Sequence, residues 1–383
     1  MIYLDHAATS FPKPPEVIEA VTRALETFGS PGRGAHAAMM TAARTVHRAR
    51  AAVADVLGGR ADRVVFTHNA TYAINMALEG LLRPGDHVIA TDLDHNAVLR
   101  PLYHLRERGV ECSFLEADAE GRVDPHALDH LRRPNTRAVV TTHASNVLGT
   151  LLDIDVIAQF CRAHDLWFIL DAAQTAGTIP IDIEAMHIDV LCFTGHKGLL
   201  GPQGTGGLIV RDRDLPMRPF AVGGSGFMSF SETMPPDLPA RMEAGTQNAH
   251  GLAGLAAGID YLKRHGIERL NERALRLADR FRDAMTDIPG IRLYGDATRP
   301  HVPIVALNIG DIDAGAVADA LDRSYGICVR AGAHCAPRVH RALGTEHQGA
   351  VRFSFGHTNT DDDVDRAVHA MRELAQTFDT SHA

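Results

Sequence analysis

The chain has 383 residues, of which 45% are hydrophobic and 22% are charged. This composition is close to that of ordinary soluble proteins, which excludes global disorder, and the length predicts two or three domains at about 150 residues each. The net charge of −9, without a dense basic run, argues against nucleic acid or an anionic membrane as a partner. The longest uncharged apolar stretch, Ala249–Ile259, is too short to span a membrane, and the first residues lack the pattern of a signal peptide. We therefore expect a cytoplasmic protein.

Helical and strand patterns alternate over about the first 210 residues. Glu16–Phe28 has one apolar stripe, as in an amphipathic helix, and the block Ala37–Leu57 ends at two glycines that would stop a helix. Several of the apolar runs are nearly continuous, which is typical of strands buried on both faces of a parallel sheet. The sequence therefore predicts a wound α/β domain with seven strands: Arg63–Thr67, His87–Ala90, Cys112–Leu115, Ala138–Thr142, Trp167–Leu170, Asp189–Phe193 and Gly207–Val210.

The pattern changes after Gly251. Helical stretches are followed by fewer strands, which predicts a smaller α+β domain at the C-terminal end. The segment Gly223–Pro239 is rich in glycine, proline and serine and predicts a loop or hairpin. The elements expected after residue 251 are Gly251–Arg264, Glu268–Met285 and Asp361–Thr377 as helices, and Val302–Ile309, Ala350–Phe355 and Ile327–Arg330 as strands.

Two residues at the carboxyl ends of predicted strands suggest a cofactor. Asp171 follows one strand and could be a simple helix cap, and Lys197 follows the next and could be an ordinary solvated lysine. Ligands of open α/β sheets bind at these strand ends. Together the two match a pyridoxal phosphate site, in which the lysine bonds to the aldehyde and the carboxylate keeps the pyridine nitrogen protonated.

Two further strand ends fit the same site. At Thr67–Thr71, free amides at a helix start would bind a phosphate, although a plain capping segment is the alternative. His95 could stack on a planar ring or belong to a structural polar loop. No G-x-G-x-x-G motif follows a strand and no Walker A motif is present, so the sequence gives little support for nucleotide binding.

The five cysteines are scattered and contain no C-x-x-C pair, which fits neither a disulfide framework nor a zinc cluster. Cys112, Cys161 and Cys192 are expected to be small buried side chains, and Cys328 to be structural. Cys335 differs because Arg330 and His334 precede it as positive neighbours, which would favour the nucleophilic thiolate.

Five ordered motifs and the segment around Cys335 resemble class V aminotransferase-like enzymes over essentially the whole chain. The last segment narrows the resemblance to cysteine desulfurases, in the group of SufS-like enzymes and selenocysteine lyases. The motifs are Leu4–Thr9, Thr142–Gly149, Asp171–Gln174, Thr194–Lys197 and Arg241–Asn248, followed by Val329–Pro337. The resemblance implies the α/β fold type I of pyridoxal phosphate-dependent transferases, with residues 14–255 as the large domain and residues 1–13 and 256–383 as the small domain.

The resemblance also implies a role for each matching position. Lys197, Cys335 and His95 would be catalytic. The cofactor would be bound by Ala70, Thr71, His95, Asn146, Asp171, Gln174, Thr194, His196, Lys197 and, from the second subunit of a homodimer, Thr246. The substrate would be bound by Asn146, Arg330, Arg352 and His36. Two positions depart from the common pattern, since Ala333 replaces a histidine and Ala70 replaces a threonine.

The implied reaction is the removal of sulfur from L-cysteine, which leaves L-alanine and a persulfide on Cys335. Only 16 residues separate Cys335 from Arg352, too few for a long mobile cysteine loop, so we expect a small sulfur-acceptor protein to serve as partner. Four alternatives stay open: a selenocysteine lyase, another class V activity such as an aminotransferase, a non-catalytic sulfur carrier or regulator, and a metal site at His334, Cys335 and His340.

Overall fold

The computed structural model describes residues 1–32, 34–212 and 214–380. Its centre is a seven-stranded sheet in the order β2-β8-β7-β6-β5-β3-β4, and β8 runs antiparallel to both of its neighbours. The other neighbouring strands pair in parallel, so the predicted, mostly parallel seven-stranded sheet is confirmed. The strands are β2 (Val64–Thr67), β3 (His87–Thr91), β4 (Glu111–Leu115), β5 (Thr136–Thr142), β6 (Trp167–Asp171), β7 (Val190–Thr194) and β8 (Gly206–Val210).

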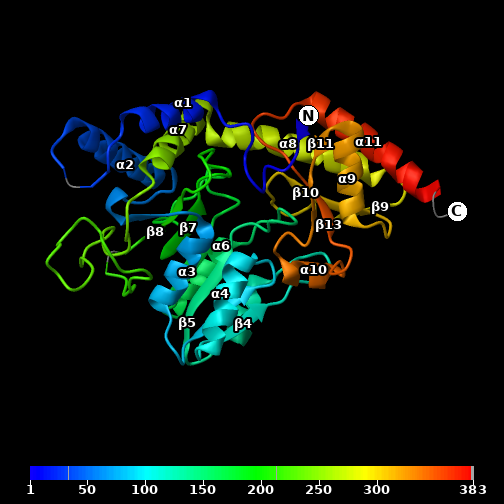
Figure 1. Cartoon of the computed structure of the whole chain (residues 1–383). Coiled ribbons are helices and arrows are strands. Elements are labelled where there is room, and N and C mark those ends of the chain that lie inside the picture. The colour runs from blue at the N-terminus through cyan, green and yellow to red at the C-terminus, as the bar shows by residue number, and fades with distance from the viewer. Residues whose placement is uncertain (33, 213, 381–383) are drawn as a thin grey trace.

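Helices cover both faces of this sheet (Figure 1). Successive side chains of a strand point to opposite faces, so in β5 Val139 packs into one core while Ala138 and Val140 pack into the other. One face is covered by α3 (Ala70–Leu81) and α4 (Asn96–Glu107), and the other by α2 (Ala37–Val56), α6 (Ile154–Ala163) and α7 (Ala249–His265). Both faces of the central strands are thus buried from solvent, which explains their continuous apolar runs. The remaining helices of this part are α1 (Pro15–Thr27), which packs on α7, and the short α5 (Leu128–Leu131).

The C-terminal part contains a four-stranded antiparallel sheet in the order β12-β13-β10-β9. Its apolar side packs against three helices. The strands are β9 (Ile291–Tyr294), β10 (Ile304–Ile309), β12 (Arg330–Gly332) and β13 (Ala350–Ser354), and the helices are α8 (Ile267–Thr286), α9 (Ala314–Tyr325) and α11 (Asp361–Thr380), with α10 (Pro337–Leu343) between β12 and β13.

The strand predicted at Ile327–Arg330 is wrong in one respect. The chain leaves one sheet at Cys328 and enters another at Arg330, so the run divides into β11 (Ile327–Cys328) and β12. β11 pairs in parallel with β1 (Ile2–Tyr3), because the N-terminal segment lies on the C-terminal part rather than beside α1 (Figure 1). The segment 223–239 contains no regular strand among the residues that are described and is a loop, as predicted.

The predicted domain boundaries stay a prediction. The division at residue 255 falls within α7, which leads directly into α8 along the top of Figure 1. The pairing of residues 1–5 with β11 and with Ser354 supports the assignment of the first residues to the smaller domain. Within the described residues, no helix has the length and apolarity to cross a membrane, and no group of three or more His, Cys, Asp or Glu residues is arranged to hold a metal ion.

Candidate active site

Polar side chains gather where the parallel strands of the large sheet end. Lys197 follows β7, Asp171 is the last residue of β6, and Asn146 and His95 follow β5 and β3. Because parallel strands end at the same edge of a sheet, residues that are far apart in the sequence meet there. The sequence prediction of a site at this edge is consistent with the arrangement.

Lys197 and Asp171 interact electrostatically across adjacent strand ends. Burial and, to a smaller extent, the nearby Arg352 guanidinium together lower the pKa of Lys197 to about 8, although the charge of Asp171 opposes the shift. Burial also raises the pKa of Asp171, and the amide N–H of Ala173 donates to its Oδ1 at 2.9 Å. This arrangement provides an amine that is partly neutral near pH 8 and a buried carboxyl group in need of a cationic partner.

The first turn of α3 lies at the end of β2. The side chain of Asn69 caps the helix by accepting from the N–H of Tyr72 at 2.9 Å, which leaves the amides of Ala70 and Thr71 at the start of the helix. A Cβ at Gly206 on β8 would lie 2.7 Å from the Cα of Asn69, so only glycine lets the helix start approach the sheet this closely. Nearby in the sheet, the hydroxyl of Thr194 is buried and has no hydrogen-bond partner among the residues that the structure describes.

His95 is positioned by the residue before it. Asp94 is fully buried and accepts from the N–H and hydroxyl of Thr91 and from the N–H of Thr142, which joins the ends of β3 and β5. His95 then caps α4, its Nδ1 accepting from the N–H of Ala97 at 2.9 Å, so the proton of the neutral ring lies on Nε2. Burial, with the charge of Lys197 next in effect, lowers the pKa of His95 to about 4.

Arg352 lies on β13 and is 1% exposed. Its Nη1 donates to the carbonyl of Asn146 and its Nη2 donates to Oδ1 of Asp5, both at 2.8 Å, while Nε has no partner within the described part of the chain. Arg330 lies opposite Arg352 in the β12–β13 register but is exposed. The structure thus places Arg352 and Asn146, two residues predicted to bind substrate, in contact with each other, and it adds Asp5 to them.

The segment that contains Cys335 is hydrogen-bonded to residues that follow β3 and β5 of the large sheet. The carbonyl of Cys335 accepts from the N–H of Asn96 at 2.7 Å, and the carbonyl of His334 accepts from Nδ2 of Asn146 at 2.8 Å. His334 and Cys335 have φ values of 50° and 56°, in the left-handed region that non-glycine residues seldom adopt. Such local strain is typical of functional segments that are held by their surroundings.

Helix α10, which follows Cys335, also contacts residues at the ends of the large-sheet strands. Nε of Arg338 donates to Oδ1 of Asp92 at 2.5 Å, and its guanidinium lies 4.0 Å from the ring centroid of Phe114. These contacts join α10 to residues at the ends of β3 and β4.

The expectation that His334 is a positive neighbour of Cys335 is wrong. The residue is 4% exposed, and burial, with the charge of Arg352 next in effect, lowers the pKa of its ring to about 3. His334 is therefore neutral near pH 7, and its Nδ1 is buried and meets no hydrogen-bond partner in residues 1–32, 34–212 and 214–380. Positive charge in this region comes from Arg330 and Arg352 instead.

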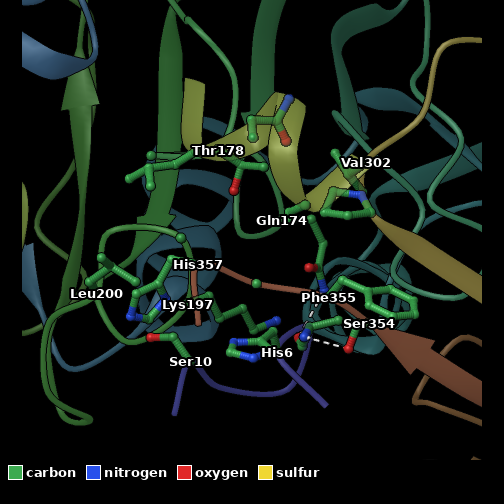
Figure 2. A pocket seen from close by; sticks show the side chains of 18 of the residues that line it. His6, Ser10, Gln174, Thr178, Lys197, Leu200, Val302, Ser354, Phe355 and His357 are labelled. Carbon is green, nitrogen blue, oxygen red and sulfur yellow. Dashed lines mark hydrogen bonds between the residues drawn. The ribbon is translucent and has the colours of Figure 1, made fainter. Parts of the chain in front are cut away.

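Gln174 and Lys197 line a cavity of about 90 Å³ together with residues that follow β13 (Figure 2). The N-terminal segment forms one wall: the carbonyl of Ala7 accepts from Nε2 of Gln174 at 3.2 Å. Oγ1 of Thr9 lies 3.1 Å from Nδ1 of His196, whose pKa burial lowers to about 4. Residues 5–9 therefore contact both Gln174 and His196.

Two predicted residues lie outside this group in the single chain. His36 is exposed and caps α2, where its Nδ1 accepts from the N–H of Met39 at 3.4 Å. Figure 1 shows α2 and β13 on opposite sides of the molecule. Thr246 is exposed in the loop before α7.

The other thiols differ in their surroundings. Cys161 and Cys192 are buried as expected, but Cys112 is half-buried on β4. Burial raises the pKa of all three thiols and that of Cys328, so they are protonated near pH 7. Cys335 is half-buried.

The sequence prediction did not single out Asp5, Asp94, Asn96 or Arg338 as site residues. Each acts by holding another residue, and such a role leaves no motif. Only the position of Asp94 and Asn96 on either side of His95, at a strand end, could have indicated them.

Comparison with known proteins identifies the family. The sequence profile of the aminotransferase class-V family matches residues 2–367. A probable cysteine desulfurase of Methanothermobacter thermautotrophicus is 37% identical, over 98% of this chain and 94% of that protein. A cysteine desulfurase of Haloferax volcanii is 32% identical, over 99% of this chain and 90% of that protein.

Solved structures agree. The apo structure of the cysteine desulfurase from Thermococcus onnurineus NA1 matches with a TM-score of 0.91 and 31% identity, over 98% of this chain and 95% of that one. The cysteine desulfurase CsdA from Escherichia coli matches with a TM-score of 0.88 and 30% identity, over 98% and 94%. The chain therefore belongs to the class-V aminotransferase family and, within it, to the cysteine desulfurases.

Proposed function

We propose that this protein is a pyridoxal phosphate-dependent cysteine desulfurase that converts L-cysteine to L-alanine and leaves the sulfur as a persulfide on Cys335. One observation supports this most directly. The carbonyls of His334 and Cys335 accept from Asn146 and Asn96, so the Cys335 backbone is held at the ends of β5 and β3, the edge of the sheet where His95 and Lys197 also lie. The names of the relatives point to the same reaction.

The residues at the strand ends fit the cofactor. The buried Thr194 hydroxyl has no hydrogen-bond partner among the described residues. With His196 and the first amides of α3, at Ala70 and Thr71, it would bind the phosphate. The carboxyl group of Asp171 would pair with the protonated ring nitrogen, which supplies the cation that its burial requires.

Three more residues complete the proposed cofactor site. Gln174 would donate to the phenolic oxygen, His95 would stack on the ring, and Lys197 would bond to the aldehyde. When bound, pyridoxal phosphate withdraws electrons from the α-carbon of the amino acid and makes its sulfur open to attack.

The substrate is an amino acid with a carboxylate, and Arg352 would bind that group. Its guanidinium is buried and keeps N–H groups beyond those used by Asp5 and Asn146. Asn146 would contact the same carboxylate, with the exposed Arg330 at the entrance. An arginine fork suits a carboxylate because it donates two parallel hydrogen bonds.

In the proposed mechanism, the amine of Lys197 would be released from the aldehyde by the amino group of the arriving substrate and, in its neutral form, would take the proton from the α-carbon of the substrate. Its lowered pKa makes this amine available near neutral pH. Sγ of Cys335 attacks Sγ of the substrate, so that a sulfur–sulfur bond forms and the carbon–sulfur bond breaks. A proton then reaches the β-carbon, and alanine leaves. His95, with its proton on Nε2, is a candidate donor at this stage.

We also propose a homodimer. The loop between β8 and α7 extends from the body of the molecule in Figure 1, and Val222, Met228 and Phe230 on it are more than half exposed. An exposed apolar surface of this kind is typical of an interface. Thr246 lies near the end of this loop and would reach the phosphate of the partner subunit, and His36 would contribute to substrate binding there.

A small protein would accept the sulfur. The turn with Cys335 is short and bonded at both His334 and Cys335, so it does not extend outward to deliver the persulfide. The acceptor must therefore approach the site itself.

The proposal is tested by measuring alanine formation from L-cysteine with excess reductant for the wild type, Cys335→Ala and the control Cys328→Ala. We expect alanine from the wild type and the control, and at least a hundredfold less from Cys335→Ala. Absence of alanine from the wild type, or equal activity of Cys335→Ala, would contradict it.

A further inference from the structure

The N-terminal segment contacts the site at several points that its position in the sequence does not suggest. Its backbone is joined to β13, where the N–H of Ala7 donates to Oγ of Ser354 at 2.9 Å and Asp5 forms a bridge with Ser354. Further along, the hydroxyl of Thr9 donates to the carbonyl of His196 at 3.0 Å. The segment thus connects the strand of Arg352 with the loop of Lys197.

Asp5 is the residue of this segment that faces Arg352. Its Oδ1 accepts from Nη2 at 2.8 Å, and the pair is well shielded, with side-chain exposures of 1% for Arg352 and 19% for Asp5. The Asp5 backbone is fixed in turn, since its carbonyl accepts from the hydroxyl of Tyr3 and from the N–H of Ala8, both at 3.1 Å. The carboxylate is therefore presented from a rigid position.

The guanidinium of Arg352 needs such a support. A planar fork binds a carboxylate in two parallel bonds only when its plane is correctly turned. The carbonyl of Asn146 fixes Nη1, and Asp5 fixes Nη2 on the other side. With either contact removed, the plane can rotate about the remaining one.

We propose that Asp5 is a positioning residue for substrate recognition, which sets the orientation of the Arg352 guanidinium toward the substrate carboxylate. This inference rests on the proposed function, in which Arg352 binds that carboxylate. Asp5 acts through its hydrogen bond, while its negative charge, close to the place of the substrate carboxylate, moderates the attraction of Arg352 and Arg330.

Two variants separate the hydrogen bond from the charge. Asp5→Ala removes both, whereas Asp5→Asn removes the charge and keeps an oxygen that accepts from Nη2. Two analogues of L-cysteine separate the carboxylate from the rest of the substrate. The first, 3-mercaptopropionate, has the carboxylate and no amine, and the second, cysteamine, has the amine and no carboxylate.

The experiment measures competitive inhibition constants of both analogues with the holoenzyme. We expect Asp5→Ala to bind 3-mercaptopropionate at least tenfold more weakly than the wild type, because a guanidinium that is no longer held in plane loses a charge-assisted hydrogen bond to the carboxylate of the analogue. Asp5→Asn should bind it at least as tightly as the wild type. The constant of cysteamine should stay within twofold in both variants.

The inference is overturned if Asp5→Ala binds 3-mercaptopropionate as tightly as Asp5→Asn does, since charge alone would then explain the effect. It is also overturned if Asp5→Ala weakens both analogues equally, which would indicate general damage to the site. Failure of the proposed function looks different, because the wild type would then form no alanine. In that case calorimetric titration of the same variants with both analogues still tests Asp5.

Discussion

Replacement of Asp94 by alanine removes the acceptor that joins the ends of β3 and β5. Two backbone N–H groups, of Thr91 and Thr142, lose their partner at a fully buried position. An unsatisfied buried donor costs about 1–3 kcal/mol. Removal of a buried carboxyl group recovers part of its desolvation cost. We therefore expect the free energy of unfolding to fall by about 2–4 kcal/mol.

Denaturant unfolding monitored by circular dichroism measures this change. Asp118→Ala is a matched control, because Asp118 also accepts from two backbone N–H groups, of Glu120 and Arg122, but is exposed, where water can replace it. We expect the control to lose less than about 1 kcal/mol. Equal losses in the two variants would refute the structural role of Asp94. Alanine formation should also fall in Asp94→Ala, since His95 follows directly.

Three further predictions follow from the site. The rate at which the apoprotein takes up pyridoxal phosphate should rise with pH and level off above about 8, because only neutral Lys197 attacks the aldehyde; a rate still rising toward the ordinary lysine pKa of 10.5 would contradict this. Arg338→Met should lower alanine formation about tenfold with cofactor binding unchanged, because α10 loses its contacts with Asp92 and Phe114. The control Arg341→Met on the same helix should have little effect, because Arg341 pairs only at the surface. Equal activities of the two variants would refute this prediction. Mixed dimers of Lys197→Ala with Thr246→Val subunits should contain one fully active site if Thr246 serves the partner, and none if it serves its own chain.

Much of the fold could be predicted because the central strands are dry on both faces. Their continuous apolar runs gave all seven strands of the large sheet within two residues at either end. The same pattern was less informative in the smaller sheet. β9 has an exposed arginine, Arg292, and only its last residue is fully buried, so it does not stand out in the sequence.

The site was predictable where chemistry demands a particular residue type at a strand end, as for Lys197 and Asp171. It was not predictable where a role depends on contacts between distant segments. Asp5 contacts Arg352, which lies 347 positions later in the sequence, and nothing in the residues around Asp5 indicates this contact. The predicted positive charge of His334 was also wrong, because burial keeps its ring neutral. The sequence of this loop does not indicate that burial.

The central claim is that sulfur passes to Cys335, and a single turnover tests it most directly. The holoenzyme is mixed with one equivalent of L-cysteine without reductant, alkylated, digested and analysed by mass spectrometry. The account predicts one extra sulfur atom on the peptide that contains Cys335, in an amount equal to the alanine formed. Alanine without sulfur on that peptide, or sulfur on the peptide of Cys328 instead, would contradict it.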